Sequence, residues 1–335
     1  MKPAPEIKHP GDVAALRLWL LDALSDGRPL ARAYNGADKV ISDGMVTNHG
    51  MVRVAGARPA NQWWSQDVLP KANLYYFGEE VVDLMQEVSQ SVPDVVMDTA
   101  LLPAKKGMLV FGKTWWGVGS DGKDVPVDAI VWGETIVPTS RLLPELSLNE
   151  SVSIGLLARS SSMQPNERGT EAFGGDQTLW APLGRTDYVV GWKRSDHEEM
   201  DTNVAFGEGT AALDQDRMMA LAAWTIINQP GLSTQHDERS KTGEQAHRRS
   251  ARKQDRKSET PPVRVIYLPE RHTSSEATGT GTKLDHRVYV APFWRQQPYG
   301  PASSLRRPVL VRGHIRGPEG TPLVRRDVVR AKITP

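Results

Sequence analysis

The chain has 335 residues, of which 39% are hydrophobic and ten are Trp, a composition that supports a packed core and excludes a wholly disordered protein. It has no Cys, which excludes disulfides, thiolate zinc sites and cysteine nucleophiles and is typical of a reducing compartment. The formal net charge is +1, so the chain as a whole is neither strongly basic nor strongly acidic.

The chain begins with residues 1–6 (MKPAPE), which lack the basic-then-apolar order of a secretory signal. No apolar run approaches the roughly 18–20 residues that cross a bilayer, and the longest, 218–227, is about half that length. We therefore expect a cytoplasmic protein without a membrane segment.

Two helices are predicted in the first hundred residues. The first spans 11–25, where Leu16, Leu20 and Leu24 recur at helical spacing and form an apolar stripe. The second spans 78–91 and has acidic residues crowded into its first turn, where the helix dipole favours negative charge.

The period of the apolar residues then changes, which predicts a sheet. Short apolar runs bounded by turn residues indicate strands at 107–112, 127–137, 151–158 and 188–192, in an antiparallel arrangement. A third helix is predicted at 211–228, and because it is apolar almost all round it should be buried.

The segment that follows the third helix is nearly free of large apolar residues, so we expect it to be a charged flexible linker, either disordered or a lone solvated helix. Beyond it, strands are predicted at 263–268, 286–291, 308–314 and 327–333.

Together these elements predict an α+β fold, with helices packed on an antiparallel sheet, followed by a small β-rich basic C-terminal domain. The expected divisions are an acidic, Trp-rich α+β domain at 1–231, the linker at 232–262 and the basic tail domain at 263–335.

Opposite charges are segregated along the chain. Residues 247–335 contain 19 Lys or Arg and 7 Asp or Glu, a net charge of +12. Subtraction from the chain totals of 41 and 40 leaves 22 and 33 for residues 1–246, a net charge of −11. This asymmetry indicates either a tail that binds a polyanion or a tail that docks on the acidic body.

The linker contains a dense basic run, 247–257 (HRRSARKQDRK). If this run is helical, its cations recur at i, i+4 and form a broad stripe that could follow a phosphate backbone. The alternative is a solvated linker whose charges only keep it extended.

In the tail, 286–318, aromatic residues alternate with Arg, as stacking on bases and pairing with phosphates would require. Alternatively, Trp294 and Tyr299 pack a small sheet, while Arg295 and Arg316 pair with acids of the front domain. The predicted nucleic-acid-binding residues are Arg248, Arg249, Arg252, Lys253, Arg256, Lys257, Trp294, Arg295, Tyr299, Arg306, Arg307, Arg312, His314 and Arg316.

Catalytic candidates are few. His286, His314 and Tyr299, together with nearby Arg, are the residue types that a metal-independent ribonuclease uses as acid, base and phosphate ligand. The acidic cluster with one His at 196–201 lacks a second His at helical spacing, so a solvated loop is preferred to a metal site. The glycine-rich stretch 117–122 lacks a Gly-Lys-Ser/Thr end, and we predict no metal and no cofactor.

The tail blocks 294–301 (WRQQPYGP), 306–309 (RRPV) and 313–318 (GHIRGP) resemble the C-terminal signature of a family of uncharacterised proteins from actinobacterial phages and mobile elements. The stretch 102–111 (LPAKKGMLVF) resembles another block of the same family. A frequent form of the first tail block reads Gly-His-Trp-Arg, whereas here 291–295 reads APFWR. More distantly, the layout is similar to a phage anti-CRISPR family that blocks synthesis of a type V-A CRISPR effector by acting on the nascent chain and its message.

Three functional hypotheses follow from the residues and the resemblance. The first is an accessory protein of a phage or mobile element, active in host takeover in the bacterial cytoplasm, that binds RNA, DNA or a ribonucleoprotein through its basic tail. The second is an anti-CRISPR-like or antitoxin-like inhibitor that contacts a host protein with the Trp-rich front domain. The third is a metal-independent ribonuclease.

Overall fold

The computed structural model describes residues 4–25, 63–93, 95–118, 124–138, 148–162, 180–191, 210–229, 234–238, 262–268, 286–290, 292–299, 301–318 and 321–324. Helices and strands are both present, and the fold is α+β, as the sequence predicts.

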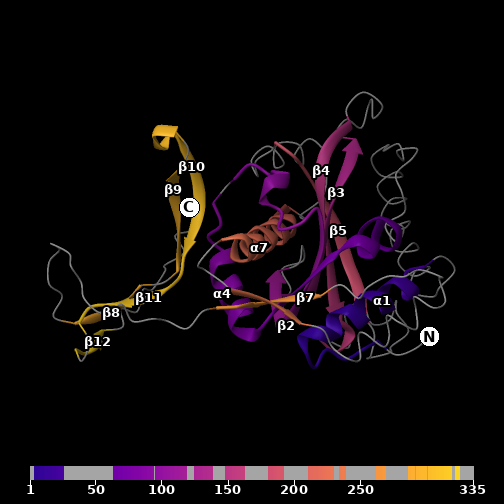
Figure 1. The fold of residues 1–335 in the computed structure, drawn as a ribbon, viewed down its shortest axis with the longest axis horizontal. Helices are drawn as coiled ribbons and strands as arrows, with labels where there is room; N and C mark the ends of the chain where they lie inside the picture. The colour runs from indigo at the N-terminus through magenta and orange to yellow at the C-terminus, as the bar shows by residue number, and fades with distance from the viewer. Residues whose placement is uncertain are drawn as a thin grey trace.

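A seven-stranded sheet forms the body of the structure (Figure 1). Its strands lie in the order β5-β4-β3-β2-β1-β7-β6. Their bounds are β1 Asn73–Phe77, β2 Lys106–Val118, β3 Asp124–Pro138, β4 Leu148–Arg159, β5 Trp180–Val189, β6 Thr234–Glu238 and β7 Val263–Tyr267.

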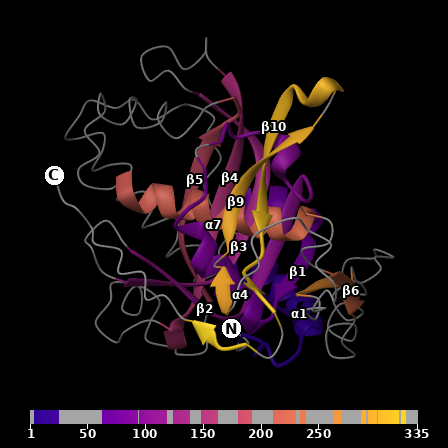
Figure 2. The same cartoon turned by 90° about the vertical axis from the view of Figure 1, so that its left-hand side faces the viewer.

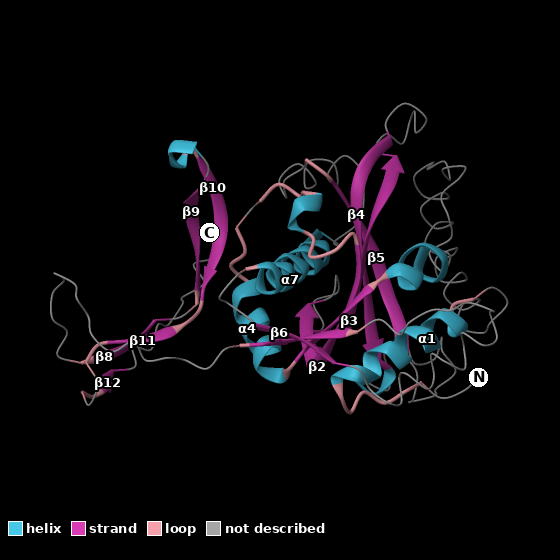
Figure 3. Cartoon of the chain, viewed as in Figure 1, coloured by secondary structure: helices cyan, strands magenta, loops and turns pink. Residues whose placement is uncertain are grey.

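Helices cover both faces of this sheet (Figure 3). One face packs against α4 (Glu79–Ser89) and α7 (Thr210–Asn228), and the other against α1 (Val13–Ala23) and the short helical segment η2 (Trp63–Val68). The three α-helices confirm the helices predicted from periodicity. None of the helices in the described part of the chain has the length and apolar composition that crossing a membrane requires. The short 3-10 turns are η1 Pro10–Asp12, η3 Leu69–Lys71, η4 Thr99–Leu101, η6 Ser160–Ser162 and η7 Pro301–Ser303.

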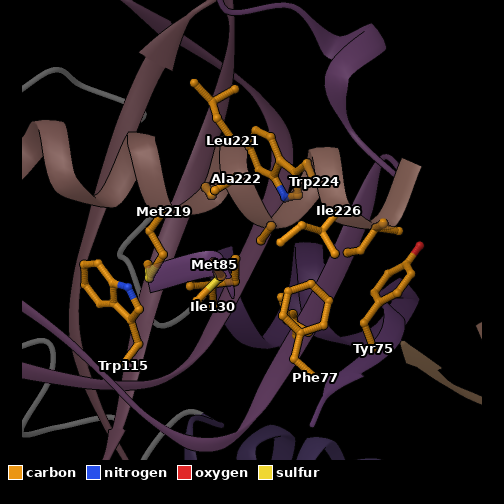
Figure 4. Close-up of a cluster of buried hydrophobic side chains, with 14 of the residues drawn as sticks. Tyr75, Phe77, Met85, Trp115, Ile130, Met219, Leu221, Ala222, Trp224 and Ile226 are labelled. Atoms are coloured by element: carbon orange, nitrogen blue, oxygen red, sulfur yellow. The ribbon is translucent and has the colours of Figure 1, made fainter. Parts of the chain in front are cut away.

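The central strands are buried on both faces, so each contributes to two cores. In β1, Tyr75 and Phe77 join the core beneath α4 and α7, whereas Leu74 joins the core beneath α1 (Figure 4). The same alternation holds in β2 and β3. Burial on both faces explains why the stretch 107–112 is a continuous apolar run instead of an alternating one.

Gly107 provides room for the ring of Trp132, its register partner on β3. A Cβ built at Gly107 would lie 2.1 Å from the Trp132 ring, which is fully buried and packs on the rings of Tyr75 and Trp224. We expect Gly107→Ala to lower the free energy of unfolding by about 1–3 kcal/mol through overpacking. Urea unfolding followed by Trp fluorescence measures the change, and Gly78→Ala, where a Cβ meets no atom within 4 Å, is the matched control. Equal midpoints for the two variants would contradict this packing.

The predicted antiparallel pairing is confirmed for β2 through β5, but the sheet as a whole is mixed. The strand β1, which the sequence analysis did not predict, is parallel to β2 on one side and to β7 on the other. The parallel pair arises because α4 occupies the connection between β1 and β2 and returns the chain to the same end of the sheet.

Two strands, β6 and β7, lie in the main sheet, whereas the sequence analysis placed their residues in the linker and the tail domain. β6 lies within the predicted linker 232–262, and β7, expected in the tail, pairs with β1 and β6 in the main sheet. β7 is held on β1 by apolar burial and by the guanidinium of Arg264, which lies 5.7 Å from the centroid of the Tyr75 ring. Burial raises the pKa of the Tyr75 phenol above its ordinary value of 10.0.

The remaining C-terminal strands form two small sheets on the α4 and α7 side of the body (Figure 2). One is a hairpin of β9 (Phe293–Tyr299) and β10 (Leu305–Val311), and the other has the order β11-β8-β12. The latter consists of β8 (Arg287–Val290), β11 (His314–Arg316) and β12 (Leu323–Val324). The predicted strand 286–291 matches β8, and 308–314 is divided between β10 and β11. The predicted strand 327–333 lies outside the described residues.

Candidate nucleic-acid interface

The segment 286–318 carries cations without any acidic residue of its own. It contains six Arg and two His, and no Asp or Glu. Strands β8 to β11 account for most of it. Because no carboxylate within the segment can neutralise its guanidinium groups, its charge is balanced only if acidic side chains from elsewhere reach it.

The β9–β10 hairpin turns one face toward the main domain. Its register places Trp294 opposite Leu310 and Arg295 opposite Val309. Leu310 is 1% exposed and belongs to the core beneath α4 and α7, and Trp294 packs against the same cluster. Because successive side chains of a strand point to opposite faces, Phe293 and Arg295 are on the outer face, where both are exposed.

Three hydrogen bonds hold the hairpin to the helices. The indole Nε1 of Trp294 donates to the carbonyl oxygen of Val88 on α4 over 3.2 Å. The side-chain amide of Gln229, directly after α7, donates to the carbonyl oxygen of Leu310 over 2.7 Å and accepts from its N–H over 2.8 Å. The hairpin is therefore anchored on the helical layer by both apolar burial and directional bonds.

The outer edges of the hairpin are poor templates for another strand. Leu310 points its backbone N–H and C=O outward to Gln229, so Pro308, two residues earlier on β10, has its nitrogen on the same edge. Gln296 is the register partner of Pro308, so its backbone N–H also points away from the partner strand. Pro298, two residues later on β9, therefore has its nitrogen at the outer edge of β9. A proline nitrogen has no N–H to donate, so both edges are blunted against strand addition.

The outer face of β9 is polar and aromatic. Phe293 is 42% exposed, and the guanidinium of Arg295 donates to the Oε1 of Gln297 over 2.6 Å. A guanidinium has five N–H groups, so this one bond leaves further donors for a phosphate or a base edge. The outer face of β9 therefore presents further hydrogen-bond donors beside an exposed aromatic ring.

The second small sheet adds exposed cationic and apolar side chains. On β11, Ile315 is 46% exposed and Arg316 is exposed beside it. Gly317 follows with φ +126, and a Cβ there would lie 2.3 Å from the carbonyl oxygen of His286, so the close approach of β11 to β8 requires glycine.

Two exposed arginines, Arg295 and Arg316, have no carboxylate partner within the described part of the chain. Within that part, Arg295 bonds only to the neutral amide of Gln297. By contrast, Arg159 in the main domain makes a partly buried ion pair with Asp128 at 2.6 Å. The predicted pairing of Arg295 and Arg316 with acids of the front domain is therefore not seen among the described residues, and it stays a prediction for the rest of the chain.

The other predicted binding residues have varied locations. The basic run of the linker (Arg248, Arg249, Arg252, Lys253, Arg256 and Lys257) lies outside the described residues. In the hairpin, the backbones of Tyr299, Arg306 and Arg307 pair with Leu305, Pro298 and Gln297, respectively. Arg312 is half-buried between β10 and β11, and Trp294 contributes its ring to docking.

The two histidines of the ribonuclease hypothesis belong to the second small sheet, where His286 directly precedes β8 and His314 begins β11. His314 pairs with Val290, four residues along the strand direction from His286. At about 3.4 Å per residue, the two Cα atoms are about 14 Å apart along the strand direction. The Nδ1 of His314 lies 3.2 Å from the carbonyl oxygen of Arg312.

Most of the Trp side chains described in the front domain are buried in its core. Six of its Trp are less than 10% exposed, whereas Trp116 on β2 is 42% exposed; the six are Trp19, Trp64, Trp115, Trp132, Trp180 and Trp224. The described residues contain no group of three or more His, Asp or Glu that could hold a metal ion. The acidic cluster 196–201 lies outside them, and Gly117 of the glycine-rich stretch is the penultimate residue of strand β2.

Three residues of this surface were not among the sequence-predicted candidates: Phe293, Gln297 and Gln229. Because side chains of a strand alternate between its faces, Phe293 and Gln297 can be assigned to the outer face once one residue of β9 is known to face inward. No sequence signal marks Gln229, because its partner Leu310 is 81 residues away.

Comparisons with protein families and with curated proteins find no match. Among solved structures, the chain is similar to the anti-CRISPR protein AcrVA2, with a TM-score of 0.33 and 10% sequence identity over 92% of each chain. A similarity of this degree is too weak to transfer a fold or a function from one protein to the other.

Proposed function

We propose that this chain binds nucleic acid through its C-terminal strands, as an accessory protein of a phage or mobile element in the cytoplasm of a bacterial host. The observation that carries the proposal is the acid-free segment 286–318, whose described outer arginines Arg295 and Arg316 have no carboxylate partner in the described part of the chain. Exposed guanidinium groups without internal partners are suited to phosphate, which they bind with bidentate geometry.

The docking of the hairpin supports the same proposal. Trp294, Leu310 and Gln229 hold its inner face against α4 and α7, so the outer face is presented on a fixed support. A fixed support lowers the conformational entropy that binding would otherwise cost. The blunted edges at Pro298 and Pro308 disfavour strand addition by a protein partner, and so favour a ligand that contacts side chains.

Neutralising two outer arginines is expected to change the salt dependence of binding. For the double variant Arg295→Gln/Arg316→Gln, the slope of log K against log salt should become shallower by about 1.4–1.8, because each lost phosphate contact removes about 0.7 for a single strand and about 0.9 for a duplex. Fluorescence anisotropy of the full chain with labelled oligonucleotides over a NaCl series measures the slope.

The matched control is Lys8→Gln/Lys105→Gln, which removes two exposed cations of the front domain. Each pairs on the surface with a Glu, and such pairs contribute little to stability. The control should keep the wild-type slope. If both double variants change the slope equally, or if the wild type binds no nucleic acid at low salt, the proposal is wrong.

The alternative function, an anti-CRISPR-like or antitoxin-like inhibitor that contacts a host protein, has one supporting observation. Trp116 is 42% exposed, and its backbone is held by Gln86 of α4, whose amide donates to the Trp116 carbonyl oxygen over 3.0 Å. A rigidly held, exposed Trp is typical of a protein-binding hot spot. Recovery of one host protein that resists nuclease treatment and is lost with Trp116→Ala would favour this alternative.

A further inference from the structure

The outer face of β9 places three different side chains in one row. Phe293, Arg295 and Gln297 follow each other at every second residue, about 7 Å apart, with an aromatic ring first, then a guanidinium, then an amide. The bond from Arg295 to Gln297 fixes the guanidinium along this row. The row therefore combines a flat apolar surface, a cation and a hydrogen-bonding group.

Phe293 is exposed and is not part of the core beneath α4 and α7. Its strand neighbour Trp294 already fills the contact with the helical layer, and 42% of the Phe293 surface stays open to solvent. A Phe ring exposed beside an uncompensated guanidinium is suited to cover the face of a nucleic-acid base, while the cation binds the adjacent phosphate.

The same geometry distinguishes a single strand from a duplex. In a duplex the base faces are stacked on one another, so a ring such as Phe293 has no face to cover without unstacking. A two-stranded ribbon can enter a major groove about 12 Å wide and about 8.5 Å deep, but it must then project from the protein. Here the inner face of the ribbon lies against α4 and α7 through Trp294 and Leu310, which leaves a one-sided platform.

We propose that the outer face of β9 is a stacking platform for single-stranded nucleic acid, with a base on Phe293 and a phosphate on Arg295. This proposal rests on the proposed function and specifies its ligand. A sheet face with outward aromatic and basic side chains accepts bases lying flat, and it tolerates different sequences because every base has a π face.

The test measures anisotropy of the full chain with three labelled probes of one sequence and length: single-stranded RNA, single-stranded DNA and duplex DNA. Phe293→Leu removes the ring and keeps apolar bulk, and we expect it to weaken binding of single strands on the order of 10-fold. Duplex binding should not change. Phe293→Trp should bind single strands with wild-type affinity, because an indole ring also stacks on bases.

Trp116→Leu is the control, because Trp116 is 42% exposed, as Phe293 is, but lies on β2 of the main domain. If Phe293→Leu lowers the affinity for single-stranded RNA alone, or for both single-stranded RNA and single-stranded DNA, the result supports the platform and identifies which strand it accepts. Unchanged single-strand affinity in Phe293→Leu, or an equal loss for the duplex, overturns the platform but leaves the proposed function standing. Absence of binding by the wild type to all three probes overturns the proposed function as well.

Discussion

Replacing Asp128 by Ala should lower the free energy of unfolding by about 3–5 kcal/mol, because it leaves a partly buried guanidinium without its carboxylate. Asp128 is fully buried on β3. It accepts hydrogen bonds from the hydroxyl of Thr114 at 2.8 Å, from the backbone N–H of Arg159 at 2.7 Å, and from two guanidinium nitrogens of Arg159 at 2.9 and 2.6 Å. The carboxylate thus joins β2, β3 and β4 where the register of β2 shifts.

The matched control is Asp83→Ala, which breaks an exposed ion pair with Lys113 between α4 and β2. Exposed pairs contribute at most about 1 kcal/mol, so this variant should unfold close to the wild type. Urea unfolding followed by Trp fluorescence compares the two variants. A midpoint for Asp128→Ala no lower than that for Asp83→Ala would show that the buried pair does not stabilise the sheet.

Truncating Leu310 to Ala should release the β9–β10 hairpin from the helices while the main sheet stays folded. Leu310 is 1% exposed, and removing a buried Leu side chain costs about 2–5 kcal/mol. A two-stranded hairpin on its own is only marginally stable in water, so loss of docking should also unfold it. Hydrogen exchange should accelerate at 293–311, with little change at 106–118 in β2.

The control for this prediction is Val309→Ala, one residue earlier on the opposite face of β10. Val309 pairs with Arg295 of the outer face and does not belong to the core. Exchange in the hairpin should therefore stay slow in this variant. Equal protection of the hairpin in Leu310→Ala and in the wild type would mean that the hydrogen bonds from Gln229 and Trp294 suffice for docking.

The helices and the antiparallel strands could be predicted because their signals are local. The stripe of Leu16, Leu20 and Leu24 and the all-round apolar surface of 218–227 each depend on a few neighbouring residues. β1 and β6 were missed for the opposite reason. β1 is a five-residue strand whose place depends on pairing with β2 and β7, and β6 (TQHDE) has an almost wholly polar sequence that forms a strand only as an edge of the sheet.

The candidate interface could be predicted in composition but not in geometry. The excess of Arg and the absence of acids at 286–318 are properties of the sequence. Which face of β9 points inward is not, because alternation alone allows Trp294 and Phe293 to exchange roles. The choice is decided by contacts with distant parts of the chain: Trp294 donates to the carbonyl oxygen of Val88, and its register partner Leu310 bonds to Gln229.

The role of the tryptophans could not be predicted from the sequence either. Their number suggested a binding surface as readily as a core. Of the seven front-domain Trp whose side chains the structure describes, burial assigns six to the core and leaves Trp116 exposed. Exposure depends on tertiary packing, so the residue type by itself does not separate the two roles.

The position of β1 between β2 and β7 has a consequence for biosynthesis. Tyr75 and its contact Arg264 are 189 residues apart in the chain. At about 5–20 residues per second, a ribosome takes roughly 10–40 s to add that length, and during this interval one edge of β1 lacks its neighbour. During this interval the newly made N-terminal part of the protein exposes an unpaired, apolar strand edge at β1. Chaperone binding to the nascent chain should therefore be strongest between the synthesis of β1 and that of β7.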